Sequence, residues 1–96
     1  MSDELKLRRD EQRGIKARQI LSDELVIKAF EDIKQMLYHK IEQSSFEQKE
    51  VREDCYRMLR ASECFEGMFK RHINTGRAAE EKLSLMKRVV KRIQEL

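Results

Sequence analysis

The chain has 96 residues, of which 41% are charged, none is proline and only three are glycine. This composition disfavours a β-sandwich or barrel, which needs turn residues at regular intervals, and favours long solvated helices that pack with other chains. Lys and Arg outnumber Asp and Glu by 21 to 18, and the resulting net charge of +3 is too small to identify a nucleic-acid-binding protein.

Targeting signals and cysteine content limit where the protein is expected to act. No apolar window approaches the ~18 residues of a transmembrane helix, and the N-terminal stretch MSDELKLRRDEQRG lacks the apolar core of a secretory signal. The two cysteines are therefore expected to be reduced thiols in a cytosol. We expect one domain over residues 1–96, with only about 60–65% of its unfolded surface buried if it is a monomer.

Residues 1–21 are a basic N-terminal arm, with six basic and four acidic side chains. Ile15, Ile20 and Leu21 do not share a helical phase with the apolar residues that follow. We predict a short helix over residues 10–21, preceded by a mobile tip.

Residues 22–43 are predicted to form an amphipathic, acidic helix. Ser22 is the expected N-cap, and Asp23 and Glu24 follow where the helix dipole favours acids. The segment has three basic and five acidic side chains. One apolar face recurs at spacings of 4, 3, 4 and 4 residues, formed by Val26, Phe30, Ile33, Leu37 and Ile41.

Residues 44–74 are predicted to form a second, longer helix. After a break at residues 43–45, Ser44 with Glu47 and Ser45 with Gln48 each have the spacing of a capping box. A stripe with strict 4-3 spacing follows, formed by Val51, Cys55, Met58, Ser62, Phe65, Phe69 and His72 and widened by Leu59 and Ile73. Such a stripe is typical of a helix that packs lengthwise on a partner.

Residues 75–96 are predicted to form a separate basic helix, with six basic and three acidic side chains. Asn74 and Gly76 tolerate the left-handed backbone that ends a helix, and Thr75 can cap the next one. We therefore predict a joint here, either a turn between antiparallel helices or only a kink. The 4-3 stripe then resumes with Ala79, Leu83, Met86, Val90 and Ile93, beside which lie Val89 and Leu96.

These elements predict an all-α fold, either a long antiparallel helical hairpin or a three-helix bundle with a short N-terminal helix. A chain of this size buries only a small apolar core by itself, and contacts with further copies of the chain would bury more. We therefore predict a homo-oligomer. The predicted packing or oligomer seam consists of Val51, Cys55, Met58, Leu59, Phe65, Phe69, Leu83, Met86, Val90 and Ile93.

Catalytic and metal-binding signatures are weak. Cys55 and Cys64 are nine residues apart, which on one helix separates them by about 13.5 Å and half a turn. The chain has no C-x-x-C or H-x-x-x-H spacing and no residue pattern that activates a nucleophile. We predict no enzyme activity, cofactor or metal. An anion site at residues 74–76, assisted by Arg77 and His72, is a weaker alternative to the helix-cap interpretation.

Two basic clusters are candidates for contact with nucleic-acid phosphates. One cluster lies opposite the apolar stripe of the last helix, and its candidate contacts are Lys87, Arg88, Lys91 and Arg92. The other lies in the N-terminal arm, and its candidate contacts are Arg8, Arg9 and Arg13, with Lys16 and Arg18 beside them. The alternative is solvated helix faces balanced by neighbouring acids. A membrane-surface role is disfavoured because the last helix lacks Trp and Phe on its apolar stripe.

The segments Arg13–Ile33 and Glu50–Leu83, about two-thirds of the chain, resemble a group of small helical proteins of tailed bacteriophages. The resemblance rests on an early Arg-Gly-x-x-Ala, an Ala-Phe pair, an Arg-Glu helix start and a closing Thr-Gly-[Lys/Arg]-x-Ala-x-x-x-Leu. Here these are Arg13, Gly14 and Ala17; Ala29 and Phe30; Arg52 and Glu53; and Thr75, Gly76, Arg77, Ala79 and Leu83.

The resemblance implies a phage setting, in the host cytoplasm or the phage particle, and a role in DNA packaging or head assembly similar to that of a small terminase subunit. Residues 1–21 are too few for an N-terminal DNA-reading domain, so backbone contact with DNA is the most that is expected. We therefore hypothesise a non-catalytic oligomerisation or interaction protein with a phage packaging or assembly partner. The alternatives are a nucleic-acid-binding accessory or regulator, and a small inhibitor that docks on a host protein.

Overall fold

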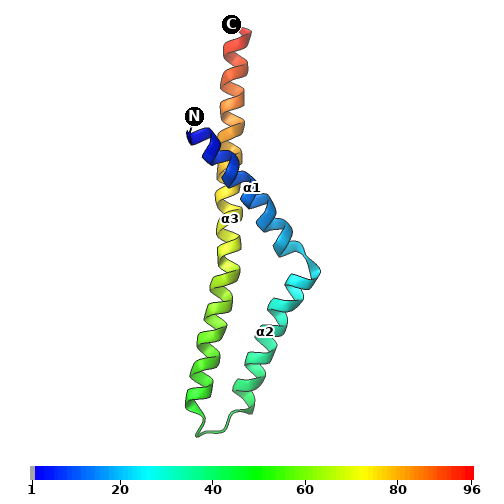
Figure 1. Cartoon of the computed structure of the whole chain (residues 1–96), viewed down its shortest axis with the longest axis vertical. Coiled ribbons are helices and arrows are strands. Elements are labelled where there is room, and N and C mark those ends of the chain that lie inside the picture. Colours follow the sequence, from blue (N-terminus) through cyan, green and yellow to red (C-terminus); the bar gives the residue numbers. More distant parts are fainter. Residues whose placement is uncertain (1) are drawn as a thin grey trace. The chain divides into compact units, whose positions relative to one another are not determined.

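The computed structural model describes residues 2–96, with the side chain of Ser2 outside this description (Figure 1). In this range the chain forms three helices and no strand: α1 (Ser2–Ser22), α2 (Glu24–Gln43) and α3 (Lys49–Glu95). The prediction of an all-α fold is confirmed.

The N-terminal helix is longer than the sequence indicated. α1 begins at Ser2, so residues 2–9 are helical and the predicted separate tip is wrong for them; Met1 lies outside the described residues. Asp3 and Glu4 lie in the first turn, where the helix dipole favours acids. Glu4 also accepts a hydrogen bond of 2.9 Å from Arg8, one turn later. These local interactions support the first turns of the helix.

The junction between α1 and α2 is capped by Asp23. Its backbone is extended, and its Oδ1 accepts hydrogen bonds from the amides of Leu25 at 2.9 Å and Val26 at 3.2 Å. Ser22 is the last residue of α1, so the prediction that it caps the next helix is wrong. The cap lies one residue later because the carboxylate oxygen of Asp23 reaches the free amides of the first turn.

The connection from α2 to α3 is held by Arg52. Its guanidinium donates to Ser44 Oγ at 3.0 Å, to the Ser45 carbonyl at 2.6 Å and to the Phe46 carbonyl at 3.3 Å. Within the loop, Gln48 Oε1 accepts from the Ser45 amide at 2.9 Å, which is one half of the predicted capping box. The break overlaps the predicted one at residues 43–45 but extends to Gln48, so α3 begins at Lys49, later than expected.

α3 runs without a break from Lys49 to Glu95. The predicted joint at residues 74–76, which divided the segments 44–74 and 75–96, is therefore wrong. Among the described residues no backbone has a positive φ, so Asn74 and Gly76 do not use the left-handed conformation that was expected of them. The reason for a glycine at position 76 lies in its contact with α1.

The chain divides into two compact units. The middle unit, Leu21–Met68, contains α2 and the first part of α3, which run in opposite directions on either side of the connecting loop (Figure 1). Its core consists of Leu37, which is 1% exposed, with Cys55 and Leu59 buried beside it and Ile41 packed against them. The Phe30 and Phe65 rings also meet, with centroids 6.2 Å apart. This core holds the two helices together.

The terminal unit comprises Met1–Ile20 and Phe69–Leu96. Here α1 crosses α3 at two glycines. A Cβ atom built on Gly14 would lie 2.9 Å from the Gly76 Cα, and one built on Gly76 would lie 2.8 Å from the Gly14 Cα. Ala17 and Ala79, three residues further along each helix, are 4% and 2% exposed. Small residues on both helices thus let the two backbones touch. The expectation of a single domain stays a prediction, since α3 belongs to both units.

Candidate interaction surface

The predicted seam is only partly covered within one chain. Cys55 and Leu59 are buried, and Phe69 and Leu83 are half-buried. The other predicted seam residues are exposed, namely Val51, Met58, Phe65, Met86, Val90 and Ile93. The seam therefore does not act as one continuous packed stripe in a single chain.

In the middle unit the covered side of α3 is rotated from the predicted one. The residues that are at least half covered are Arg52, Glu53, Cys55, Leu59, Ser62, Glu66 and Gly67. Three of these, Arg52, Leu59 and Glu66, lie one residue after the predicted positions 51, 58 and 65. A shift of one residue turns a helix by about 100°, so Val51, Met58 and Phe65 lie toward the edge of the contact with α2. Periodicity gave the correct spacing in this part of α3 but an incorrect centre for the buried face.

The last turns of α3 carry an apolar surface that no other described residue covers. Every residue from 84 to 96 is exposed. At about 100° per residue, six of them share one side of the helix; this C-terminal apolar face consists of Leu85, Met86, Val89, Val90, Ile93 and Leu96. Contiguous exposed apolar surface of this kind marks an interaction site in a water-exposed protein.

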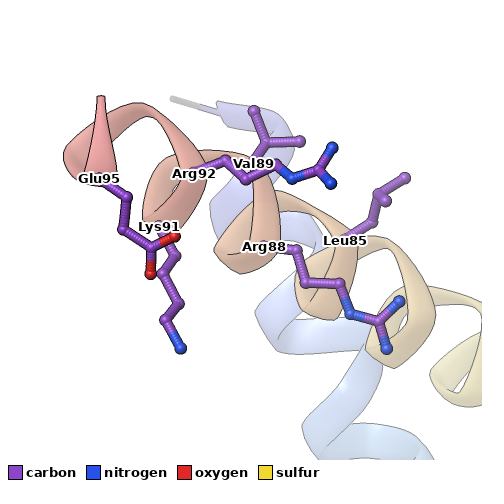
Figure 2. A pocket seen from close by; sticks show the side chains of 6 residues that line it. All are labelled: Leu85, Arg88, Val89, Lys91, Arg92 and Glu95. Atoms are coloured by element: carbon purple, nitrogen blue, oxygen red, sulfur yellow. The ribbon is translucent and has the colours of Figure 1, made fainter.

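The other side of the same helix is basic. This basic face consists of Lys87, Arg88, Lys91 and Arg92, the four C-terminal residues predicted for nucleic-acid contact. Figure 2 shows Arg88 and Arg92 at the edge nearer to Leu85, with Lys91 and Glu95 on the other side of the ribbon. Within residues 2–96 none of the four cations forms an ion pair. The structure thus brings these predicted residues together and leaves their charges open to a ligand.

The N-terminal cluster is less uniform. Arg8 pairs with Glu4, whereas Arg9, Arg13 and Lys16 share another side of α1 at spacings of four and three residues. The structure therefore separates Arg8 from the other predicted contacts of α1.

Part of this cluster lines a shallow hollow of the terminal unit. It is lined by Arg13, Lys16, Ala17, Ile20, Phe69 and His72. Sequence reasoning did not predict this grouping. The available signal was the repeated Gly-x-x-Ala in Gly14–Ala17 and Gly76–Ala79, which brings the two helices together.

Cys64 and a lysine–aspartate pair on α2 lie outside the surfaces described above, and Cys55 lies in the core of the middle unit. Cys55 is buried and Cys64 is exposed. No group of three or more His, Cys, Asp or Glu side chains that could hold a metal occurs among residues 2–96. On α2, Asp32 accepts a hydrogen bond of 2.6 Å from Lys28, and this bond raises the pKa of the Lys28 ammonium. Both partners are exposed, so the pair is a feature of the helix surface.

No described helix combines the length and apolarity needed to cross a bilayer. Comparison with known proteins found no matching protein family, no matching curated protein and no matching solved structure.

Proposed function

We propose that this chain is a non-catalytic helical interaction protein that self-associates through the C-terminal apolar face. The observation that carries the proposal is the exposure of six apolar side chains on residues 84–96. Fully burying one such side chain stabilises a complex by about 1.5–3 kcal/mol, and several together can exceed the roughly 4–15 kcal/mol that association costs.

The spacing of this face favours a second copy of the same helix as the partner. Leu83, Met86, Val90 and Ile93 follow the 3-4-3 pattern of a helix packed lengthwise on a like helix. Lys87 and Lys91 lie on the opposite side, so they stay in water when the apolar face is covered. An oligomer built in this way presents several basic faces together.

The setting we propose is phage DNA packaging or head assembly, in the host cytoplasm or the phage particle. It is supported by the resemblance of Arg13–Ile33 and Glu50–Leu83 to small helical phage proteins. A large terminase subunit or a portal protein is the expected partner. Co-purification of the full chain with either protein tests this setting, and its absence with both would argue for another role.

Self-association is tested by light scattering on the full chain over a range of concentrations. The triple variant Met86→Ser, Val90→Ser, Ile93→Ser is expected to reduce the mass to that of a monomer, because it removes the apolar contact. The matched control Arg88→Gln, Lys91→Gln, Arg92→Gln changes the same turns outside the apolar face and is expected to keep the oligomer. A wild-type monomer at high micromolar concentration would overturn the proposal.

A second candidate function is contact with nucleic-acid phosphates through the basic face. It is favoured by four exposed cations that form no ion pair within residues 2–96. Binding of this kind weakens steeply with salt because it releases counterions. Changing all four cations to Glu is expected to abolish binding of duplex DNA at moderate salt. Unchanged affinity in that variant would exclude the basic face as the contact.

A further inference from the structure

The hollow of the terminal unit combines charge and apolar surface in a way that the C-terminal faces do not. Arg13 and Lys16 of α1 and His72 of α3 supply nitrogen groups, while Ala17, Ile20 and Phe69 supply apolar surface. No carboxylate lines it, in contrast to the neighbouring surface on α3, where Glu80 and Glu81 accompany Arg77 and Arg88. This lining is chemically complementary to an anionic ligand that also has an apolar surface.

The crossing of α1 and α3 fixes the geometry of this hollow. Arg13 precedes Gly14, whose added Cβ would lie 2.9 Å from the His72 carbonyl oxygen. Because backbone lies against backbone at this point, the side chains on either side are carried by two helices that cannot slide freely past each other. The volume of about 320 Å³ lies at the small end of the ~300–1,000 Å³ of known small-ligand sites.

We propose that this hollow binds one nucleotide unit of a single-stranded nucleic acid, with the base against Phe69 and the adjoining phosphates at Arg13 and Lys16. Single strands are held by a basic groove together with aromatic side chains on which bases stack. A duplex keeps its bases stacked inside and offers only phosphate, which leaves the apolar part of the hollow unused. Arg9, on the same side of α1, continues the basic path beyond the hollow.

This site uses residues of α1 and residues 69–72 of α3, and it does not depend on the C-terminal apolar or basic faces.

The test is fluorescence anisotropy of the full chain with a labelled oligothymidylate, compared with a duplex of the same length. Phe69→Leu keeps an apolar side chain but removes the stacking ring, and it is expected to weaken single-strand binding at least about fivefold. Circular dichroism of the variant checks that the helices are retained.

A second variant avoids the half-buried ring. Arg13→Gln with Lys16→Gln changes exposed side chains only, and it is expected to lower the slope of log affinity against log salt by about 0.7 for each phosphate that the protein no longer neutralises. The matched control Lys40→Gln with Arg60→Gln changes two exposed cations of the middle unit and is expected to leave this slope unchanged. Light scattering on the same samples reports self-association separately, so the failure of one proposal does not decide the other.

Several results would overturn the site. They are single-strand affinity that does not respond to Phe69→Leu, an equal loss of duplex affinity in that variant, and binding of an acidic peptide in place of the oligonucleotide. Thymidine monophosphate distinguishes a strand from a free nucleotide. Competition by the monophosphate at the concentration of the strand would assign the hollow to free nucleotides, whereas its failure to compete supports the strand.

Discussion

Gly14 and Gly76 lie so close together that neither position has room for a Cβ atom. The added atom would be 2.8–2.9 Å from the Cα of the opposite glycine, and 2.9 Å from a carbonyl oxygen, that of His72 or of Asp10. Backbone atoms cannot rotate away as a flexible side chain can, so α1 and α3 would have to separate. The close crossing therefore depends on glycine at both positions.

Replacing either glycine by alanine is expected to destabilise the terminal unit by about 1–3 kcal/mol, which is the usual cost of overpacking. Thermal unfolding followed by circular dichroism should show a fall in midpoint of roughly 4–8 °C per kcal/mol. Gly67→Ala is the matched control, since a Cβ there meets nothing within 4 Å. In a helix interior that change is expected to stabilise by about 0.5–1 kcal/mol. Equal effects at positions 67 and 76 would contradict the crossing.

Arg52 is expected to control the order of the loop between α2 and α3. Arg52→Ala removes three hydrogen bonds to residues 44–46 and should cost about 1–2 kcal/mol, since the contacts are charge-assisted but partly solvated. Amide hydrogen exchange should rise in the loop and in the first turn of α3. Arg52→Lys should recover little of the loss, because one ammonium cannot span three acceptors as a planar guanidinium does. Full recovery by lysine would show that charge alone holds the loop.

Asp23 is expected to matter as an N-cap. Asp23→Ala leaves the amides of Leu25 and Val26 without their side-chain acceptor and should destabilise the middle unit by about 0.5–2 kcal/mol. Asp23→Asn keeps an oxygen acceptor and should remain near wild type. Denaturant unfolding of both variants measures the difference. An alanine variant as stable as the asparagine variant would place the cap elsewhere.

Ser62 is expected to tolerate loss of its hydroxyl. Its Oγ is buried, and no described residue provides it with a hydrogen-bond partner. Because an unsatisfied buried polar group costs about 1–3 kcal/mol, Ser62→Ala should be neutral or stabilising in denaturant unfolding. Ser84→Ala, at an exposed position of the same helix, is the control and should change stability by less than about 0.5 kcal/mol. A marked loss of stability in Ser62→Ala alone would reveal a partner for the hydroxyl.

Local signals predicted much of the middle unit. The apolar spacing of Val26, Phe30, Leu37 and Ile41 identified the covered side of α2, and these residues are buried or half-buried there. The break near Ser44 and Ser45 was also found, since capping and turn preferences act between residues close in sequence. Ile33 is exposed despite the same spacing, because the centre of the contact is set by the opposite helix.

The terminal unit shows where local reasoning fails. Asn74, Thr75 and Gly76 have the composition of a helix end, yet α3 passes through them. A glycine costs a helix only about 1 kcal/mol relative to alanine, and contact with another backbone can offset that cost. The candidate hollow was missed for the same reason, since Arg13 and Phe69 are far apart in sequence.

The amino-acid sequence alone determined that this protein is helical, that its termini are basic and that an apolar stripe continues to its last residues, because composition and periodicity act within single helices. Only the tertiary structure decided which side of α3 is covered, why residue 76 is glycine and which apolar residues remain exposed. Those properties depend on the approach of a second helix, and steric contact between distant segments leaves no periodic signal in either one.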